Sequence, residues 1–190
     1  MGNHDKSRVG SRYQEEKIDA LMALVLTLPG VAVTYNVRNL FNNKIFVFHF
    51  SILFNIKGEE IGMLDNWDMT LEDMKDPQAC NSNNMWASRD PFRTPFQWDN
   101  TNNAGFTTGT PWLPLHSNYV TRNLKAQESA EKSYYKFYKS LSALRKEPTM
   151  QNGSYKSYVF NTNVLTYIRY YIIIFFNNFH FVIEYNNRIL

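Results

Sequence analysis

The side chains best suited to binding chemistry lie between residues 88 and 112. This stretch combines fixed charges with flat aromatic rings: Arg89, Asp90, Phe92, Arg93, Phe96, Trp98, Asp99, Phe106 and Trp112. Prolines and glycines recur within it, so it predicts a loop rather than a regular helix or a central strand. Flat rings beside fixed charges suit a polar, ring-shaped ligand such as a sugar. The alternative is a surface loop with a small aromatic cluster.

A second pair of chemically active side chains lies near the start of the chain. His4 precedes Asp5 directly, and Arg8 follows three residues later. Taken alone, an adjacent histidine and aspartate form a surface hydrogen bond more often than a functional site. The pair is therefore a candidate whose role depends on what the rest of the chain indicates.

Composition excludes several classes of function. The chain has 190 residues, enough for one ordinary domain, and a net charge of +3, too small to indicate binding to nucleic acid. Its single cysteine, Cys80, cannot form an internal disulfide. No His/Cys cluster has the spacing of metal ligands, so we expect neither a metal nor a cofactor. No signal peptide follows Met1, and no apolar stretch reaches the roughly 20 residues of a spanning helix.

Periodic patterns along the chain predict the helices and strands that must position these side chains. Apolar residues at helical spacing from 18 to 28 predict a helix that ends at Pro29-Gly30, with Ser11 and Gln14 as its capping box. A short buried strand is expected at 31–35. Helix, tight turn and apolar strand together form one αβ step of a parallel barrel.

The second half predicts one long helix followed by strands. Asn123 is expected to cap a helix that continues to just before Pro148. Its apolar stripe is typical of core packing. Residues 153–169 alternate loosely between apolar and polar residues and are expected to open a β-domain.

Three motifs resemble signatures of glycoside hydrolase family 13. Residues 88–99 and 103–106 are similar to the S-R-D-x-x-R-T-P-M/F-Q-W-D and N-A-G-F motifs of its α-glucosidases, oligo-1,6-glucosidases and insect maltases. Residues 2–5, Gly-Asn-His-Asp, resemble the family's fourth conserved region at the end of barrel strand seven. Residues 58–63 resemble its G-E-E-I-G-M stretch, which follows strand eight.

The resemblance implies an α/β fold: a fragment of a (β/α)8 TIM barrel, from the end of strand 7 through helix 8, followed by the beginning of a small β-domain. Residues 1–147 would be the C-terminal portion of the catalytic barrel, interrupted by 37–57. Residues 148–169 would start the C-terminal β-domain, and 170–190 would be a tail foreign to the family.

The resemblance also implies roles for three residues. Asp5 would be the catalytic carboxylate that stabilises positive charge developing at the anomeric carbon. His4 would hydrogen-bond the hydroxyls of the sugar. Arg93 would recognise the non-reducing terminal glucose, a task that suits the paired donors of a guanidinium. Both His4 and Asp5 would lie at the carboxyl end of a barrel strand, where such enzymes keep their chemistry.

Other conspicuous side chains are expected to be structural. Glu59 and Glu60 are adjacent, so they do not offer the two carboxylates about 5–5.5 Å apart on opposite sides of a sugar that retaining hydrolysis needs. Gln97, Trp98 and Asp99 are expected to hold the shape of their loop.

Two segments depart from the family pattern. Residues 37–57 separate strand eight from the Gly-Glu-Glu motif. Residues 170–190 have a similar composition, rich in Phe, Ile and Asn. Each is interpreted as a translated intron, because removing 37–57 restores the family's order. The alternative for 37–57 is an extra strand or hairpin, and the alternative for 170–190 is an aggregation-prone C-terminal strand. A dominant mature transcript that retains 37–57 would contradict the intron interpretation.

The function implied is a glycoside hydrolase of the α-glucosidase or maltase type, which releases terminal α-linked glucose from small oligosaccharides with retention. The family's G-F-R-x-D nucleophile motif and its acid/base Glu are absent from these 190 residues. We therefore expect this chain to be a truncated piece, inactive alone. The intact family member would be secreted, or extracellular and membrane-anchored, with maltose, sucrose or a similar α-glucoside as substrate. The alternative is a non-catalytic ectodomain, such as an amino-acid transporter heavy chain or a toxin receptor.

Overall fold

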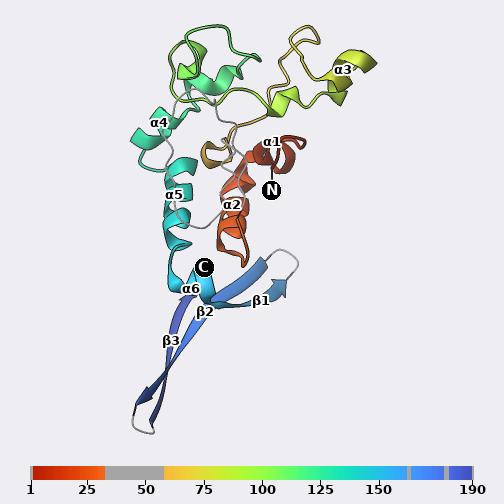
Figure 1. Cartoon of the computed structure of the whole chain (residues 1–190). Coiled ribbons are helices and arrows are strands. Elements are labelled where there is room, and N and C mark those ends of the chain that lie inside the picture. Colours follow the sequence, from red (N-terminus) through yellow and green to blue (C-terminus); the bar gives the residue numbers. More distant parts are fainter. Residues whose placement is uncertain (1, 33–57, 162–163, 178–179, 190) are drawn as a thin grey trace. The chain divides into compact units, whose positions relative to one another are not determined.

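The computed structural model describes residues 2–32, 58–161, 164–177 and 180–189 (Figure 1). The chain divides into two compact units: unit 1 comprises Met1–Val25 and Ala32–Tyr138, and unit 2 comprises Leu26–Val31 and Lys139–Leu190. The insert at 37–57 and most of the expected strand at 31–35 lie outside the described residues. Both therefore stay predictions, as do the proposed domain boundaries.

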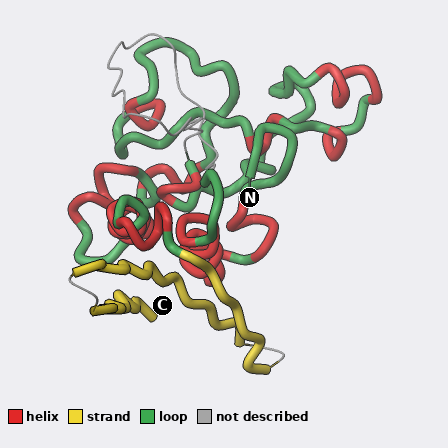
Figure 2. The backbone as a smooth tube through the Cα atoms, turned by 60° about the horizontal axis from the view of Figure 1, so that its bottom comes forward, coloured by secondary structure: helices red, strands yellow, loops and turns green. Residues whose placement is uncertain are grey.

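Unit 1 consists of short helices joined by 3-10 turns. Its α-helices are α1 Val9–Tyr13, α2 Ile18–Thr27, α3 Pro77–Ser82, α4 Leu124–Ser129 and α5 Tyr134–Leu144, of which α2 and α5 continue into unit 2. Its 3-10 turns are η1 Glu15–Lys17, η2 Glu59–Ile61, η3 Met85–Ala87, η4 Asp90–Phe92, η5 Asn102–Gly105 and η6 Ser117–Val120. The described part of unit 1 contains no strand, and the strands drawn in yellow in Figure 2 all belong to unit 2.

The N-terminal helix is broken, which corrects the expected capping box. Gln14 has φ of 78°, so the chain leaves α1 there and re-enters a helix at Ile18. Ser11 lies inside α1, and its hydroxyl accepts a hydrogen bond from the Asp65 backbone N–H at 2.8 Å. The capping-box prediction is wrong because α1 already begins at Val9, which places Ser11 inside the helix, and because the helix breaks at Gln14. The predicted end before Pro29 is confirmed.

The charged and aromatic stretch is a loop, as predicted, and its first part, up to Gln97, is largely buried. Thr94, Phe96 and Gln97 are at most 2% exposed. Backbone groups of the loop are satisfied by neighbouring segments, as burial requires: the N–H of Leu124 donates to the Gln97 carbonyl at 3.0 Å. The side chain of Gln97 donates to Asn118 at 2.7 Å, which confirms its expected structural role.

The predicted long helix after Asn123 is instead two helices, α4 and α5, and a third helix, α6 Pro148–Asn152, begins at the proline before which the prediction ended. The Asn123 side chain caps α4 as expected, accepting from the Ala126 N–H at 2.8 Å. Polar side chains stabilise the break between α4 and α5. Ser133 Oγ accepts from the Lys136 N–H at 3.2 Å, and Gln127 Oε1 accepts from the Tyr135 N–H at 2.9 Å.

Two small apolar clusters contribute to the core in the described part of unit 1. One comprises Met69, Met74, Ala79 and Leu113. The other comprises Ile61, Met63 and Phe96. Helix α3 contributes Ala79 to the first cluster, and Asp76 and Pro77 provide its cap and a favourable first helical residue.

Unit 2 contains an antiparallel sheet of the order β1-β2-β3, with β1 Ser154–Asn161, β2 Val164–Asn177 and β3 His180–Ile189. The expected strands after residue 153 are confirmed. The register pairs Ser154 with Tyr170 and Ile174 with Ile183. The backbone of 170–177 and 180–189 thus has the strand conformation that the sequence left open as an alternative, while the origin of 170–190 as an intron stays a prediction.

Two arginines in unit 2 cap the end of α2. Arg145 donates to the carbonyl of Leu26 at 2.6 Å, and burial lowers the pKa of its guanidinium. Arg169, 2% exposed, donates to the carbonyls of Thr27 at 3.1 Å and Met150 at 2.8 Å. Cations at a helix C-terminus stabilise its last carbonyl groups.

Candidate functional site

The N-terminal turn that carries His4 and Asp5 is held by carboxylates from other segments of unit 1. The backbone N–H of Gly2 donates to Glu59 Oε1 at 2.7 Å, and that of Arg8 donates to Asp65 Oδ1 at 2.8 Å. Within the turn, the Asp5 N–H donates to Asn3 Oδ1 at 2.8 Å. These anchors fix the backbone on both sides of the two candidate residues.

Arg93 joins this turn and brings together all three side chains that the sequence singled out. Its Nη2 lies 2.9 Å from Asp5 Oδ1, and its Nε donates to the His4 carbonyl at 2.7 Å. His4 Nε2 lies 3.0 Å from Asp5 Oδ2. Residues 88 positions apart therefore meet in one polar cluster, here called the Asp5 cluster (His4, Asp5 and Arg93).

A second arginine, which the sequence analysis did not single out as a site residue, also contacts Asp5. Arg89 Nη1 lies 3.2 Å from Asp5 Oδ1. The same guanidinium binds Asp76 with two hydrogen bonds, Nε to Oδ2 at 2.7 Å and Nη2 to Oδ1 at 2.8 Å. Arg89 belongs to the same motif as Arg93, but only the fold shows which carboxylates each arginine contacts.

Asp76 is the electrostatic anchor of this arrangement. Its side chain is fully buried, and it also accepts from the backbone N–H of Arg89 at 2.9 Å and of Gln78 at 3.1 Å. The side-chain hydrogen bonds from Arg89 hold the pKa of Asp76 well below its usual range, and Asp76 in turn raises the pKa of the guanidinium. Forked pairs of this kind are among the strongest hydrogen bonds in proteins.

The Asp5 cluster is open to solvent, so its polar atoms can reach a ligand. The exposed fractions of the side chains are 65% for His4, 45% for Asp5 and 26% for Arg93. Guanidinium donors, an imidazole and a carboxylate are suited to hydrogen-bonding neutral hydroxyl groups. One carboxylate cannot perform retaining hydrolysis, which needs two.

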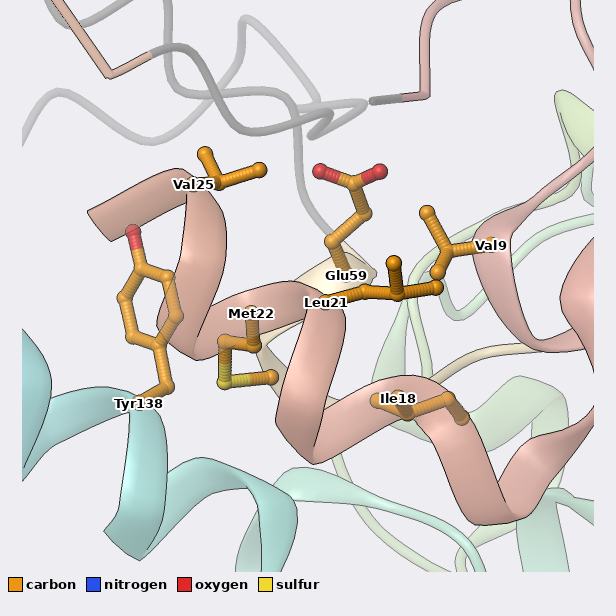
Figure 3. Close-up of a pocket in the computed structure, with 7 residues that line it drawn as sticks. All are labelled: Val9, Ile18, Leu21, Met22, Val25, Glu59 and Tyr138. Atoms are coloured by element: carbon orange, nitrogen blue, oxygen red, sulfur yellow. The ribbon is translucent and has the colours of Figure 1, made fainter. Parts of the chain in front are cut away.

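Glu59 lies outside this cluster, beside an apolar cavity of ≈ 30 Å³ (Figure 3). The remaining lining residues are Val9, Ile18, Leu21, Met22, Val25 and Tyr138. Figure 3 shows the Glu59 side chain among apolar ones. A space of about this size holds little more than one water molecule and no sugar. The hydrogen bond to Gly2 and the cavity's small size confirm a structural position for Glu59.

In the described part of the chain, no three His, Cys, Asp or Glu side chains are grouped so that they could hold a metal ion. No helix among the same residues is long and apolar enough to cross a membrane.

Comparisons with known proteins find close relatives. The α-amylase catalytic domain, as a family, matches residues 1–153. Maltase 1 of Drosophila virilis is 42% identical over 168 residues, covering 86% of this chain and 23% of that protein. The salivary α-glucosidase of Aedes aegypti is 40% identical over 173 residues, covering 89% of this chain and 26% of that protein.

Solved protein structures also resemble this chain. A trehalose-6-phosphate hydrolase of Bacillus licheniformis matches with a TM-score of 0.68 and 26% identity, covering 89% of this chain and 31% of that chain. The chain spans about a quarter of the length of the curated relatives it matches.

Proposed function

The chain belongs to the α-amylase catalytic-domain family, glycoside hydrolase family 13, and on that premise we propose that it is the glucose-holding part of an α-glucosidase. The solved neighbours are barrel enzymes of the same family. The proposed function is release of terminal α-linked glucose, with retention, from a small α-glucoside such as maltose or sucrose. The chain would supply the barrel from the end of strand 7 through helix 8 and the start of the β-domain.

One observation carries the proposal. His4, Asp5 and Arg93, which the family resemblance assigns to the sugar, lie within hydrogen-bonding distance of one another and are accessible to solvent. In the proposed site Asp5 stabilises charge at the anomeric carbon, His4 binds ring hydroxyls, and Arg93 recognises the terminal ring. Arg89 keeps the Asp5 carboxylate in place through its contact at 3.2 Å.

The proposal divides binding from bond cleavage. Retaining hydrolysis needs a nucleophilic carboxylate and an acid/base carboxylate. The family's motif for the nucleophile does not occur in these 190 residues. The chain alone is therefore proposed to bind glucose units without cleaving them. We extend the proposal to a secreted or membrane-anchored extracellular setting, because one relative is a salivary α-glucosidase.

The test combines binding and hydrolysis on the purified 190-residue chain. Maltose binding is measured by saturation-transfer NMR and calorimetry, and glucose release from maltose by a coupled assay. We expect binding by the wild-type chain, loss of binding in Arg93→Ala and in Asp5→Ala, and no release of glucose by any of them. Arg12→Ala is the matched control, since Arg12 lies over the Tyr13 ring and outside the cluster.

Two results would overturn parts of this proposal. Glucose release by the chain, free of contaminating enzyme, would show that binding and cleavage are not divided as proposed. Absence of maltose binding, or equal binding by wild type and Arg93→Ala, would remove the assignment of the sugar site. A non-catalytic ectodomain has no need of these contacts, so their integrity favours the hydrolase.

A further inference from the structure

Two tryptophans outside the Asp5 cluster form an exposed aromatic pair. Trp86 lies on η3 and is 72% exposed. Its ring centroid is 5.0 Å from that of the half-buried Trp67, and the two rings are inclined by 32°. Single exposed aromatic side chains are ordinary on protein surfaces. A ring that is mostly exposed and also supported by a second ring offers a flat, defined surface for a ligand.

The backbone beneath Trp86 is held rigidly. The Trp86 N–H donates to Asn84 Oδ1 at 3.0 Å, and the Asn84 N–H donates to the Ala79 carbonyl at 3.2 Å. Met85, the neighbouring residue on η3, packs against the apolar cluster that contains Met69 and Ala79. The orientation of the indole is therefore set by packed and capped neighbours rather than by a free loop, which lowers the entropic cost of binding.

The same region positions the sugar-holding residues. Asp76 begins α3, where it accepts from the Gln78 N–H, and it also binds Arg89, which contacts Asp5. Arg89 follows Trp86 by three residues, so their Cα atoms lie within about 11 Å, the reach of a fully extended chain of that length. The Arg89 side chain spans the rest of the path to Asp5, which it contacts at 3.2 Å. This path, from Asp5 along Arg89 to Trp86, is the one that an oligosaccharide bound at Asp5 would follow.

We propose that the Trp67–Trp86 pair is a second sugar subsite, which stacks against an outer ring of an α-linked oligosaccharide whose terminal glucose is held by the Asp5 cluster. The inference rests on the proposed function. The C–H face of a pyranose is apolar and slightly positive, which suits the negative face of an indole. The outer ring needs no charged partner at this subsite, consistent with a neutral saccharide.

The experiment compares a short and a long ligand on the full chain. Dissociation constants for methyl α-glucoside and maltotriose are measured by calorimetry for wild type, Trp86→Ala and Trp86→Phe. We expect Trp86→Ala to weaken maltotriose binding about tenfold, as loss of a stacked ring does, and to leave methyl α-glucoside unchanged. Trp86→Phe, which keeps a flat ring, is expected to retain most of the maltotriose affinity.

Trp112→Ala is the matched control. Trp112 is 49% exposed and paired with Phe106 at 6.0 Å between ring centroids, so its removal deletes a similar surface aromatic outside the proposed subsite. Maltotriose should bind this variant as it binds wild type. At a maltotriose concentration that saturates wild type, tryptophan emission should change in Trp112→Ala and change much less in Trp86→Ala.

The outcomes separate the subsite from the proposed function. Equal maltotriose binding by wild type and Trp86→Ala, or no maltotriose binding at all, overturns the subsite. Maltotriose binding that depends on Trp86 but not on Asp5 or Arg93 supports the aromatic subsite and removes the assignment of the Asp5 cluster. Protection of Trp86 by self-association of the chain, seen as a concentration-dependent mass, would also overturn the subsite.

Discussion

At the scale of single residues, the site depends on one carboxylate between two guanidiniums. Asp5 Oδ1 lies 2.9 Å from Arg93 Nη2 and 3.2 Å from Arg89 Nη1. The two arginines differ in what else they bind: the Arg89 side chain also binds the buried Asp76, whereas the Arg93 side chain also donates to the His4 carbonyl of the exposed N-terminal turn. Arg93 is therefore the more adaptable of the two toward a ligand.

The substitution Arg93→Lys tests whether the guanidinium fork matters. Lysine keeps the positive charge but offers one compact ammonium, so it cannot contact both the His4 carbonyl and Asp5 in the present geometry. We expect maltose affinity to fall about tenfold, the effect of roughly one charge-assisted hydrogen bond. Calorimetry measures the change, with Arg12→Lys as control; unchanged affinity in Arg93→Lys would show that charge alone suffices.

Acid should destabilise the region around Asp76 only when the pH falls below the usual pKa range of an aspartate side chain. The pKa of Asp76 is lower in the folded state than in the unfolded state, where it is about 4. The ionised carboxylate therefore contributes its full stabilisation above about pH 4, and this stabilisation is lost as the pH falls through the folded-state pKa. We expect the near-ultraviolet circular dichroism of the Trp67–Trp86 pair to persist from pH 7 to about pH 4 and to fade below that.

The variant Asp76→Asn is the control for this titration. It cannot form the ionic pair with Arg89, so its circular dichroism signal should already be reduced at pH 7 and should change little below about pH 4, where the wild-type signal fades. A variant that retains the wild-type acid profile would exclude Asp76 as the titrating anchor. Carbon-13 NMR of the Asp76 carboxyl group measures the pKa directly.

At the scale of elements, polar side chains decide where helices stop. Gln127 is 8% exposed and links three segments: it donates to the Ile61 carbonyl at 2.7 Å and accepts from the Tyr135 N–H at 2.9 Å. The Ser133 hydroxyl donates to the backbone carbonyl of Gln127 at 2.8 Å. These bonds fix the break between α4 and α5 and join it to η2.

Replacing Gln127 by alanine should open this junction. The substitution leaves the Ile61 carbonyl and the Tyr135 N–H without their present partners, and each such loss costs about 1–3 kcal/mol. We expect hydrogen exchange of the Tyr135 amide to quicken at least about tenfold. Glu128→Ala, on the exposed side of the same helix, is the control; equal exchange in both variants would contradict this role for Gln127.

At the scale of the whole molecule, we expect the isolated chain not to unfold in a single cooperative step. Two of the apolar clusters in the described part of unit 1 are small, this part contains no strand, and unit 2 has its own sheet. We therefore predict that the isolated chain shows no sharp cooperative thermal transition. Scanning calorimetry tests this, because a two-state domain gives a calorimetric enthalpy equal to the van't Hoff enthalpy. A single sharp peak that meets this criterion would contradict the prediction.

The amino-acid sequence alone determined the family and the candidate site. The motifs around Asp5 and Arg93 are long and specific, and the end of α2 at Thr27 and the cap at Asn123 follow from local chemistry that tertiary contacts leave in place. Local patterns succeed where the residues that decide a structure are neighbours in the chain.

Only the tertiary structure decided what depends on distant residues. The capping box at Ser11 was wrong because Ser11 lies inside α1, where its hydroxyl accepts from the backbone of Asp65, 54 positions away. The single long helix was wrong because the chain breaks near Gln127, which contacts Ile61 across 66 positions. Arg89 emerged as a partner of Asp5 only when the fold placed Asp76 beneath it. A hydrogen bond is made by whichever groups meet in space, and a single sequence does not say which distant groups those are.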